Sequence, residues 1–225
     1  SARPSRGGGI IGIAFPAPAM PSEPPGAPAP GGPVPHGSEI GRQRLASWRE
    51  SFDDGLPVVL FVLCARSGGT VRYAKTVASL LAGRAHVLYA IGTRGGAVVL
   101  CRDPDAHKDG AAFGVQRSGT ALAAALARLG VRRINVAHAL HFEDRLVDLL
   151  AVWGLPYDLT LTDYYLAADH PHLIGTAGPS CRRDPRPALV DGAERLIACS
   201  ADLATGLSVF WPDLTVIPAG PVDGF

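Results

Sequence analysis

Short apolar runs alternate with amphipathic stretches along most of this chain. The longest run predicts a buried strand over 57–65, and the apolar spacing after it predicts a helix over 71–82. The same alternation predicts further strands at 85–91, 97–101, 133–137, 157–161, 195–199 and 214–217, and further helices at 118–129, 142–153 and 200–210. Strands that alternate with helices build a mostly parallel sheet with helices on both faces, so we predict an α/β fold.

The beginning of the chain lacks this pattern. Residues 1–36 carry half of the 20 prolines and show neither helical nor strand periodicity. We therefore expect a Pro/Gly-rich arm or linker over 1–40 and a folded domain over 41–222, which opens with a short polar helix at 41–52. Because residue 1 is serine and the only methionine is Met20, we expect the chain to be a piece of a longer protein.

Composition narrows the classes of protein that fit. Lys and Arg (21) nearly balance Asp and Glu (20), so no broad field favours nucleic acid or an anionic membrane. The four cysteines show no CxxC spacing, which favours reduced thiols and a cytoplasmic location. No apolar run approaches the roughly 18 residues of a membrane span.

Polar residues follow the predicted strands at their carboxyl ends, where parallel sheets bind ligands. They are Ser67, Gly68, Gly69 and Thr70 after the first strand, His138 and His141 after 133–137, Thr162, Asp163, Tyr164 and Tyr165 after 157–161, and Ser200 after 195–199. Two glycines at a helix N-terminus let a phosphate or a sugar hydroxyl approach unpaired backbone N–H groups, although they also suit a tight turn that binds nothing. We expect these side chains to converge on one edge of the sheet.

Several familiar sites do not fit these residues. The double glycine lacks the third glycine of a GxGxxG fingerprint, and no Gly-Lys-Ser/Thr of a Walker A loop occurs. His138, His141 and Asp163 could ligate zinc together with His170 or His172, but no HExxH frame holds them, so we expect no metal. Asp163 fits a general base or sugar-hydroxyl acceptor and equally an Asx-type turn.

Longer segments carry a family resemblance. They are 60–63 with 67–73, then 131–140, 155–164, Cys181, and 195–200 with 216–218. In order and spacing these segments resemble the N-terminal half of a GT-B glycosyltransferase, most closely the retaining family 4 ("group 1") enzymes of bacterial surface polysaccharide synthesis. The resemblance covers about residues 57–222. It implies a Rossmann-like domain that mainly binds the acceptor, and a C-terminal donor domain that this chain lacks.

The resemblance also implies roles for single residues. Asp163 and His138 would be catalytic, orienting the acceptor hydroxyls, and the substrate-binding residues would be Gly68, Gly69, Thr70, Arg72, His141, Thr162 and Tyr164. The sequence departs from the family at Thr162 and Val71, where relatives carry His and often Glu. It also has Asn135 and Ala137 where relatives commonly have histidines.

The activity implied is metal-independent glycosyl transfer with retention, without a cofactor. The partners implied are a nucleotide-sugar donor, a glycan or lipid-linked acceptor and, for the parent protein, a membrane surface; the fragment alone would be inactive. The alternative is a non-catalytic Rossmann-like binding or regulatory module, which Thr162 favours. An α/β hydrolase fits least, because residues 178–182 lack the last glycine of a Gly-x-Ser-x-Gly elbow.

Overall fold

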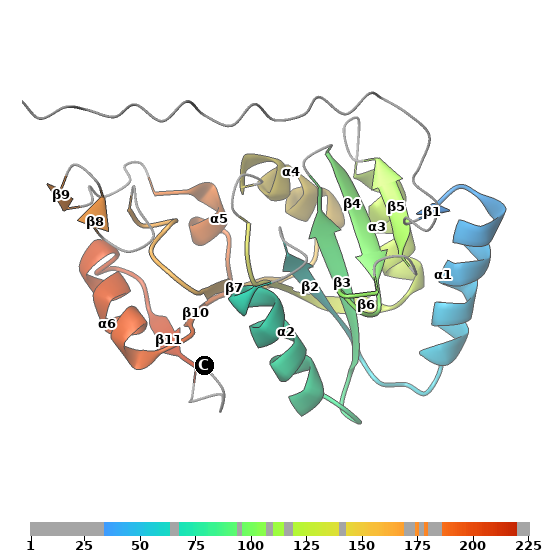
Figure 1. Ribbon diagram of the computed structural model, residues 1–225, viewed down its shortest axis with the longest axis horizontal. Helices are drawn as coiled ribbons and strands as arrows, with labels where there is room; N and C mark the ends of the chain where they lie inside the picture. The colour runs from blue at the N-terminus through green and yellow to red at the C-terminus, as the bar shows by residue number, and fades with distance from the viewer. Residues whose placement is uncertain are drawn as a thin grey trace, which may run out of the picture. The chain divides into compact units, whose positions relative to one another are not determined.

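The structure, a computed structural model, describes residues 34–63, 68–93, 96–106, 110–114, 119–139, 143–168, 174–175, 178–179 and 186–219. These residues contain a nine-stranded sheet, a two-stranded antiparallel pair and six helices (Figure 1). From one edge of the large sheet to the other, the strands are β1 (Val34–Pro35), β5 (Ala111–Gly114), β4 (Ala97–Cys101), β3 (His86–Gly92), β2 (Val58–Leu63), β6 (Val131–Val136), β7 (Tyr157–Leu161), β10 (Arg195–Ala198) and β11 (Val216–Pro218). The small pair is β8 (Ile174–Gly175) with β9 (Gly178–Pro179).

All neighbouring strands of the large sheet are parallel except those that flank β4. β3 ends at Gly92 and β4 begins at Ala97, and such a short connection can join only antiparallel strands. Thr93 closes the turn, because its backbone N–H donates to the Ala97 carbonyl oxygen at 2.9 Å. The predicted α/β class with a mostly parallel sheet is confirmed.

Apart from a short helix at Ala188–Asp191, which the pattern did not predict, the helices follow the expected positions closely. They are α1 (Glu39–Ser51), α2 (Gly69–Leu80), α3 (Thr120–Arg128), α4 (Glu143–Trp153), α5 (Ala188–Asp191) and α6 (Ala201–Phe210). Ser38 caps α1, its hydroxyl accepting the Gly41 N–H at 3.0 Å, and Ser200 caps α6 in the same way through the Leu203 N–H at 3.1 Å. The folded part already includes β1, so residues 34–35 and 39–40, which we expected in the arm, belong to the sheet and to α1.

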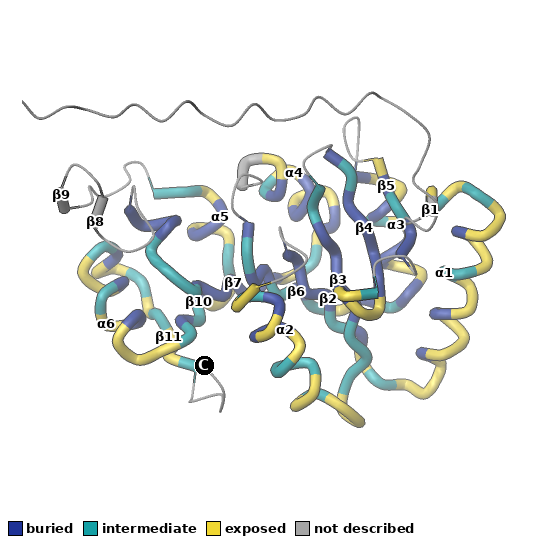
Figure 2. The backbone as a smooth tube through the Cα atoms, in the orientation of Figure 1, coloured by how far each residue is buried: buried dark blue, intermediate teal, exposed yellow. Residues whose placement is uncertain are grey.

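Alternate residues of the central strand β2 pack on opposite faces of the sheet, as the pleat requires. Leu60 and Val62 join a large buried cluster with side chains of α3, α4 and α6. Phe61 and Leu63 join a smaller cluster with Val71 and Ala74 of α2. Helices therefore cover both faces, and the strands are the most buried part of the chain (Figures 1 and 2). Within the described ranges no helix is both long and apolar enough to cross a bilayer.

The strand order contains a topological switch point at β2. The chain passes from β2 to its neighbour β3 on one side and later reaches β6 on the other side. The loop after β6 is tied to the end of β2, because the Ala137 and His138 N–H groups donate to the Val62 carbonyl oxygen at 3.0 and 3.4 Å. Open α/β sheets bind ligands outside the carboxyl ends of their strands at such a point.

Candidate functional site

The N-terminus of α2 lies at the switch point and is open. Gly68 is the N-cap, with φ of 108° and ψ of −172°, and no side chain caps the helix. A Cβ atom built on Gly68 or Gly69 would meet nothing within 4 Å, so neither glycine is needed for close packing of helix against strand. No side chain of the described residues caps these N–H groups, so they and the positive end of the helix dipole suit an anion or a hydroxyl oxygen.

We expect the two glycines to respond differently to alanine. The Gly68 conformation lies in a region that only glycine adopts readily, so Gly68→Ala should lower the free energy of unfolding by about 1–3 kcal/mol. Gly69 is the first helical residue and its surroundings are open, so Gly69→Ala should change stability by no more than about 0.5 kcal/mol or raise it. Urea denaturation measures both values, and equal losses for the two variants would contradict this description of the turn.

His138 is held at the end of β6 by an aromatic contact. Its ring stacks on Tyr165, with ring centroids 5.2 Å apart and planes 22° apart. The buried Tyr165 hydroxyl in turn accepts the Ala139 N–H at 3.0 Å. Tyr165, which the sequence placed at this strand end without assigning it a role, therefore orients His138 and fixes the loop after β6.

Asp163 follows β7 and forms an Asx-type contact, since its Oδ1 atom accepts the Tyr165 N–H at 2.8 Å. Its other carboxylate oxygen has no hydrogen-bond partner among the residues that the structure describes, and the side chain is half-buried. The local-turn interpretation of Asp163 is thus confirmed, and one oxygen remains for a ligand.

The neighbours of Asp163 are engaged with other elements. The Thr162 carbonyl oxygen accepts a hydrogen bond from Cys199 Sγ at 3.7 Å. Burial raises the pKa of Cys199, and the negative charge of Asp163 adds to the effect. Tyr164 packs on α6, with its ring centroid 6.0 Å from that of Phe210 and its hydroxyl group against Gly206. A role of Tyr164 in substrate binding stays a prediction.

A polar network that we did not predict lies behind this edge. Asn135 of β6 donates to Thr160 Oγ1 of β7 at 3.0 Å, and the buried Thr160 also shares a hydrogen bond with the hydroxyl group of Tyr73 from α2. Burial raises the pKa of Tyr73. The network joins α2 to the two strands that carry His138 and Asp163. Polar residues at alternate positions of apolar strands were the signal that could have revealed it.

A shallow groove of about 460 Å³ continues from Gly68 along α2. Arg72 and Lys75 line it together with Val71, Thr76, Ser79 and Asp105. Lys75 is paired with Asp105 at 2.5 Å and lies 3.5 Å from Asp103. The Arg72 guanidinium is exposed and makes no hydrogen bond or ion pair to any residue in the described ranges, so it can reach an anion at the α2 N-terminus.

The structure thus brings Gly68, Gly69, Thr70, Arg72, His138, Thr162 and Asp163 to the carboxyl edge formed by β2, β6 and β7. His141, His170 and His172 lie outside the described residues. Within those residues, no group of three or more His, Cys, Asp or Glu side chains could hold a metal ion.

Comparisons with family models, curated proteins and solved structures find no match to this chain.

Proposed function

We propose that this chain is the N-terminal, acceptor-side domain of a retaining GT-B glycosyltransferase similar to the family 4 enzymes. The observation that carries the proposal is that Gly68, His138 and Asp163 follow three adjacent strands at the switch point of the sheet. They supply an open helix N-terminus, an imidazole and a carboxylate, which are the groups that a sugar nucleotide and a sugar acceptor require.

The helix N-terminus serves the donor side of the proposed reaction. In that reaction the bond between the anomeric carbon and the donor diphosphate breaks, and the oxygen of an acceptor hydroxyl forms a new bond to the same face of the sugar while its proton passes to the leaving diphosphate. Negative charge grows on the leaving diphosphate, where the uncapped N–H groups after Gly68 and the exposed Arg72 would stabilise it. A second, donor-binding domain of the parent protein would supply the remaining cations, so this chain alone should bind without turnover.

Asp163 and His138 serve the acceptor side. The unoccupied Asp163 oxygen accepts a hydrogen bond from an acceptor hydroxyl, and the stacked His138 ring fixes the direction of a second one. Thr162 replaces the histidine that commonly contacts the transferred sugar in the family, so we expect acceptor or sugar choice to differ from that of typical relatives.

A non-catalytic binding or regulatory module is the second candidate. The observations that favour it are Thr162 and the packing of Tyr164 on α6. Such a module would bind a ligand at the same edge, but it would support no sugar transfer even within the intact parent protein.

The Asp163→Asn variant isolates the charge of the carboxylate. An amide oxygen can keep the contact with the Tyr165 N–H, so stability should change by no more than about 0.5 kcal/mol. Acceptor binding should weaken by about tenfold or more, because the amide cannot supply a charge-assisted hydrogen bond. Asp163→Ala is the control for the turn and should lose stability as well as binding. Equal saccharide affinity in Asp163→Asn and the wild type would remove Asp163 from the proposed site.

Titration of the intact chain tests the proposal as a whole. UDP-glucose, UDP-N-acetylglucosamine, GDP-mannose and free UDP are added in turn, followed by saccharides, while calorimetry and amide NMR shifts are recorded. We expect binding to shift the amide signals of residues 68–72. The affinity should fall at least fivefold in Gly69→Ala. It should stay unchanged in Gly114→Ala, the control, which alters a second open glycine at the end of β5. If none of these compounds shifts these amides, both candidate functions fail for this ligand class. Binding without transfer by the intact parent protein would support the non-catalytic module.

A further inference from the structure

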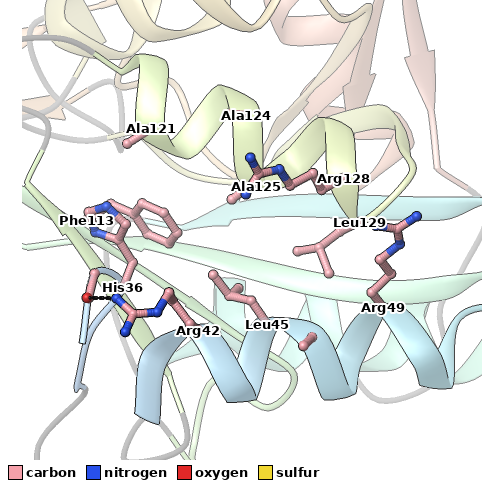
Figure 3. A pocket seen from close by; sticks show the side chains of 12 residues that line it. His36, Arg42, Leu45, Arg49, Phe113, Ala121, Ala124, Ala125, Arg128 and Leu129 are labelled. Carbon is pink, nitrogen blue, oxygen red and sulfur yellow. Dashed lines mark hydrogen bonds between the residues drawn. The ribbon is translucent and has the colours of Figure 1, made fainter. Parts of the chain in front are cut away.

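A second hollow lies between α1 and α3, and none of its described lining residues belongs to the candidate site. Figure 3 shows it with α1 on one side, α3 on the other and Phe113 of β5 at one end. Its volume is about 470 Å³, within the range of roughly 300–1,000 Å³ found for small-molecule sites. We call it the α1–α3 groove.

The interior of the α1–α3 groove is apolar. Phe113 is 1% exposed and Leu129 4% exposed, while Leu45 is half-buried and points from α1 into the space between the helices (Figure 3). The remaining apolar lining consists of alanines, namely Ala46, Ala121, Ala124 and Ala125. These small side chains leave open the volume that larger residues would fill, so the groove has room for an apolar ligand.

Arginines surround this apolar interior. Arg42 and Arg49 of α1 and Arg128 of α3 line the groove, and none of the described lining residues is a carboxylate. Arg42 is neutralised by Glu39 at 2.5 Å. Arg49 and Arg128 are exposed and make no hydrogen bond or ion pair within the part of the chain that the structure describes.

The position of these two arginines in the last turns of their helices is favourable for a cation. Both arginines also lie around one apolar hollow whose described lining includes no carboxylate, so the hollow is complementary to an anion. In Figure 3 Arg128 extends over the groove from α3, and Arg49 rises toward it from the end of α1.

His36 closes the other end of the groove. Its ring stacks on Phe113 with ring centroids 4.4 Å apart and planes 12° apart, and its Nδ1 atom lies 3.2 Å from the Ala112 carbonyl oxygen. The aromatic pair forms a fixed flat wall, against which the apolar end of a ligand can pack.

We propose that the α1–α3 groove binds a small amphiphilic anion, an organic carboxylate or phosphate ester whose apolar body lies over Leu45, Ala125 and Leu129 and whose charge pairs with Arg128 and Arg49. A single dissolved molecule is the occupant, because Phe113 and Leu129 are recessed below the exposed arginines. A bilayer surface would meet the arginines without reaching these apolar residues.

The test uses the intact chain with octanoate as probe, and octanol and inorganic phosphate as the apolar and anionic halves alone. We expect octanoate to shift amide signals in α1 and α3. Octanol and inorganic phosphate should each bind at least tenfold more weakly than octanoate. The charge is tested by Arg128→Gln, which should weaken octanoate binding at least fivefold, whereas Arg84→Gln, at an exposed arginine after α2, should not change it. The cavity is tested by Ala124→Leu, which fills the groove from an exposed helical position and should abolish binding while thermal unfolding confirms an intact fold.

Three results would overturn the proposal. Octanol binding as tightly as octanoate would remove the role of the arginines, and unchanged octanoate affinity in Ala124→Leu would place the ligand elsewhere. Binding of anionic phospholipid vesicles without binding of octanoate would make the surface a membrane contact. None of these results depends on sugar-nucleotide binding at the β2, β6 and β7 edge, so this proposal and the proposed function fail separately.

Discussion

Replacing Asp158 with asparagine is expected to lower the free energy of unfolding by about 3 kcal/mol, the lower end of the range for breaking a buried ion pair. Asp158 is 4% exposed, and its carboxylate accepts two hydrogen bonds from Arg133 and two from Arg195, all between 2.6 and 2.8 Å. An asparagine amide offers only one acceptor oxygen and no charge. The two arginines retain some access to water, which keeps the loss at the low end of the range.

The same carboxylate makes stability depend on pH. Burial alone would raise the pKa of Asp158, but the hydrogen bonds from Arg195 and Arg133 outweigh it and lower that pKa to about 2. The ordinary pKa of 3.8 applies in the unfolded chain, so the unfolded state binds the proton first as the pH falls. The stabilisation is therefore complete above about pH 4 and is lost between about pH 4 and pH 2.

Urea denaturation of the wild type and of Asp158→Asn between pH 7 and pH 2 measures how the stabilisation by Asp158 depends on pH. The difference in unfolding free energy between wild type and Asp158→Asn should shrink by about 2 kcal/mol as the pH falls from 5 to 2. Asp148→Asn, at an exposed position of α4, is the control and should change stability little at any pH. A difference that stays constant down to pH 2 would contradict the role assigned to the arginines.

Replacing Gly206 with alanine is expected to destabilise the protein by about 1–3 kcal/mol, the usual cost of overpacking. A Cβ atom at this position would overlap the Tyr164 hydroxyl oxygen and would lie 2.9 Å from its Cζ atom. The rigid ring can relieve the overlap only by moving away from α6. The gain from a better helix former, about 1 kcal/mol at most, does not offset this cost.

Thermal unfolding measures the loss, at roughly 2–4 °C per kcal/mol for a chain of this size. Thr205→Ala, an exposed neighbour in α6, serves as the control and should leave the melting temperature unchanged or slightly higher. Tyr164→Phe combined with Gly206→Ala should recover part of the loss, because it removes the atom that overlaps most. No recovery in the double variant would mean that the contact between Tyr164 and α6 is described incorrectly.

The apolar pattern predicted most of the strands and helices to within about two residues, because the buried side chains of a helix or strand recur along the sequence at the period of that element. β5 escaped detection because Ala111 to Gly114 contains only small residues and one phenylalanine. β1 is two residues long and ends in proline, so it carries no period at all. The direction of β4 follows from the short connection after Gly92, a signal that was present in the sequence.

The strand ends were predicted to share an edge, and the order β2, β6, β7 brings Gly68, His138 and Asp163 to adjacent strands. The contacts that fix these residues were beyond prediction, because they depend on that order. Tyr165 reaches His138 and Ala139 only once β6 and β7 are neighbours, and Tyr164 meets Gly206 only once α6 lies beside the loop after β7.

The sheet combines two kinds of connection, and this has a consequence for folding order. The antiparallel strands β3, β4 and β5 follow one another directly along the chain, with residues 93–96 and 102–110 between them, whereas β2 meets β6 only after a long excursion of the chain. Pairings between distant segments form slowly, since closing a long loop costs entropy before the new contacts repay it. The strand ends that carry Gly68 and His138 are therefore brought together only by a distant pairing of the sheet, and ligand binding at this edge should be recovered late by a refolding chain.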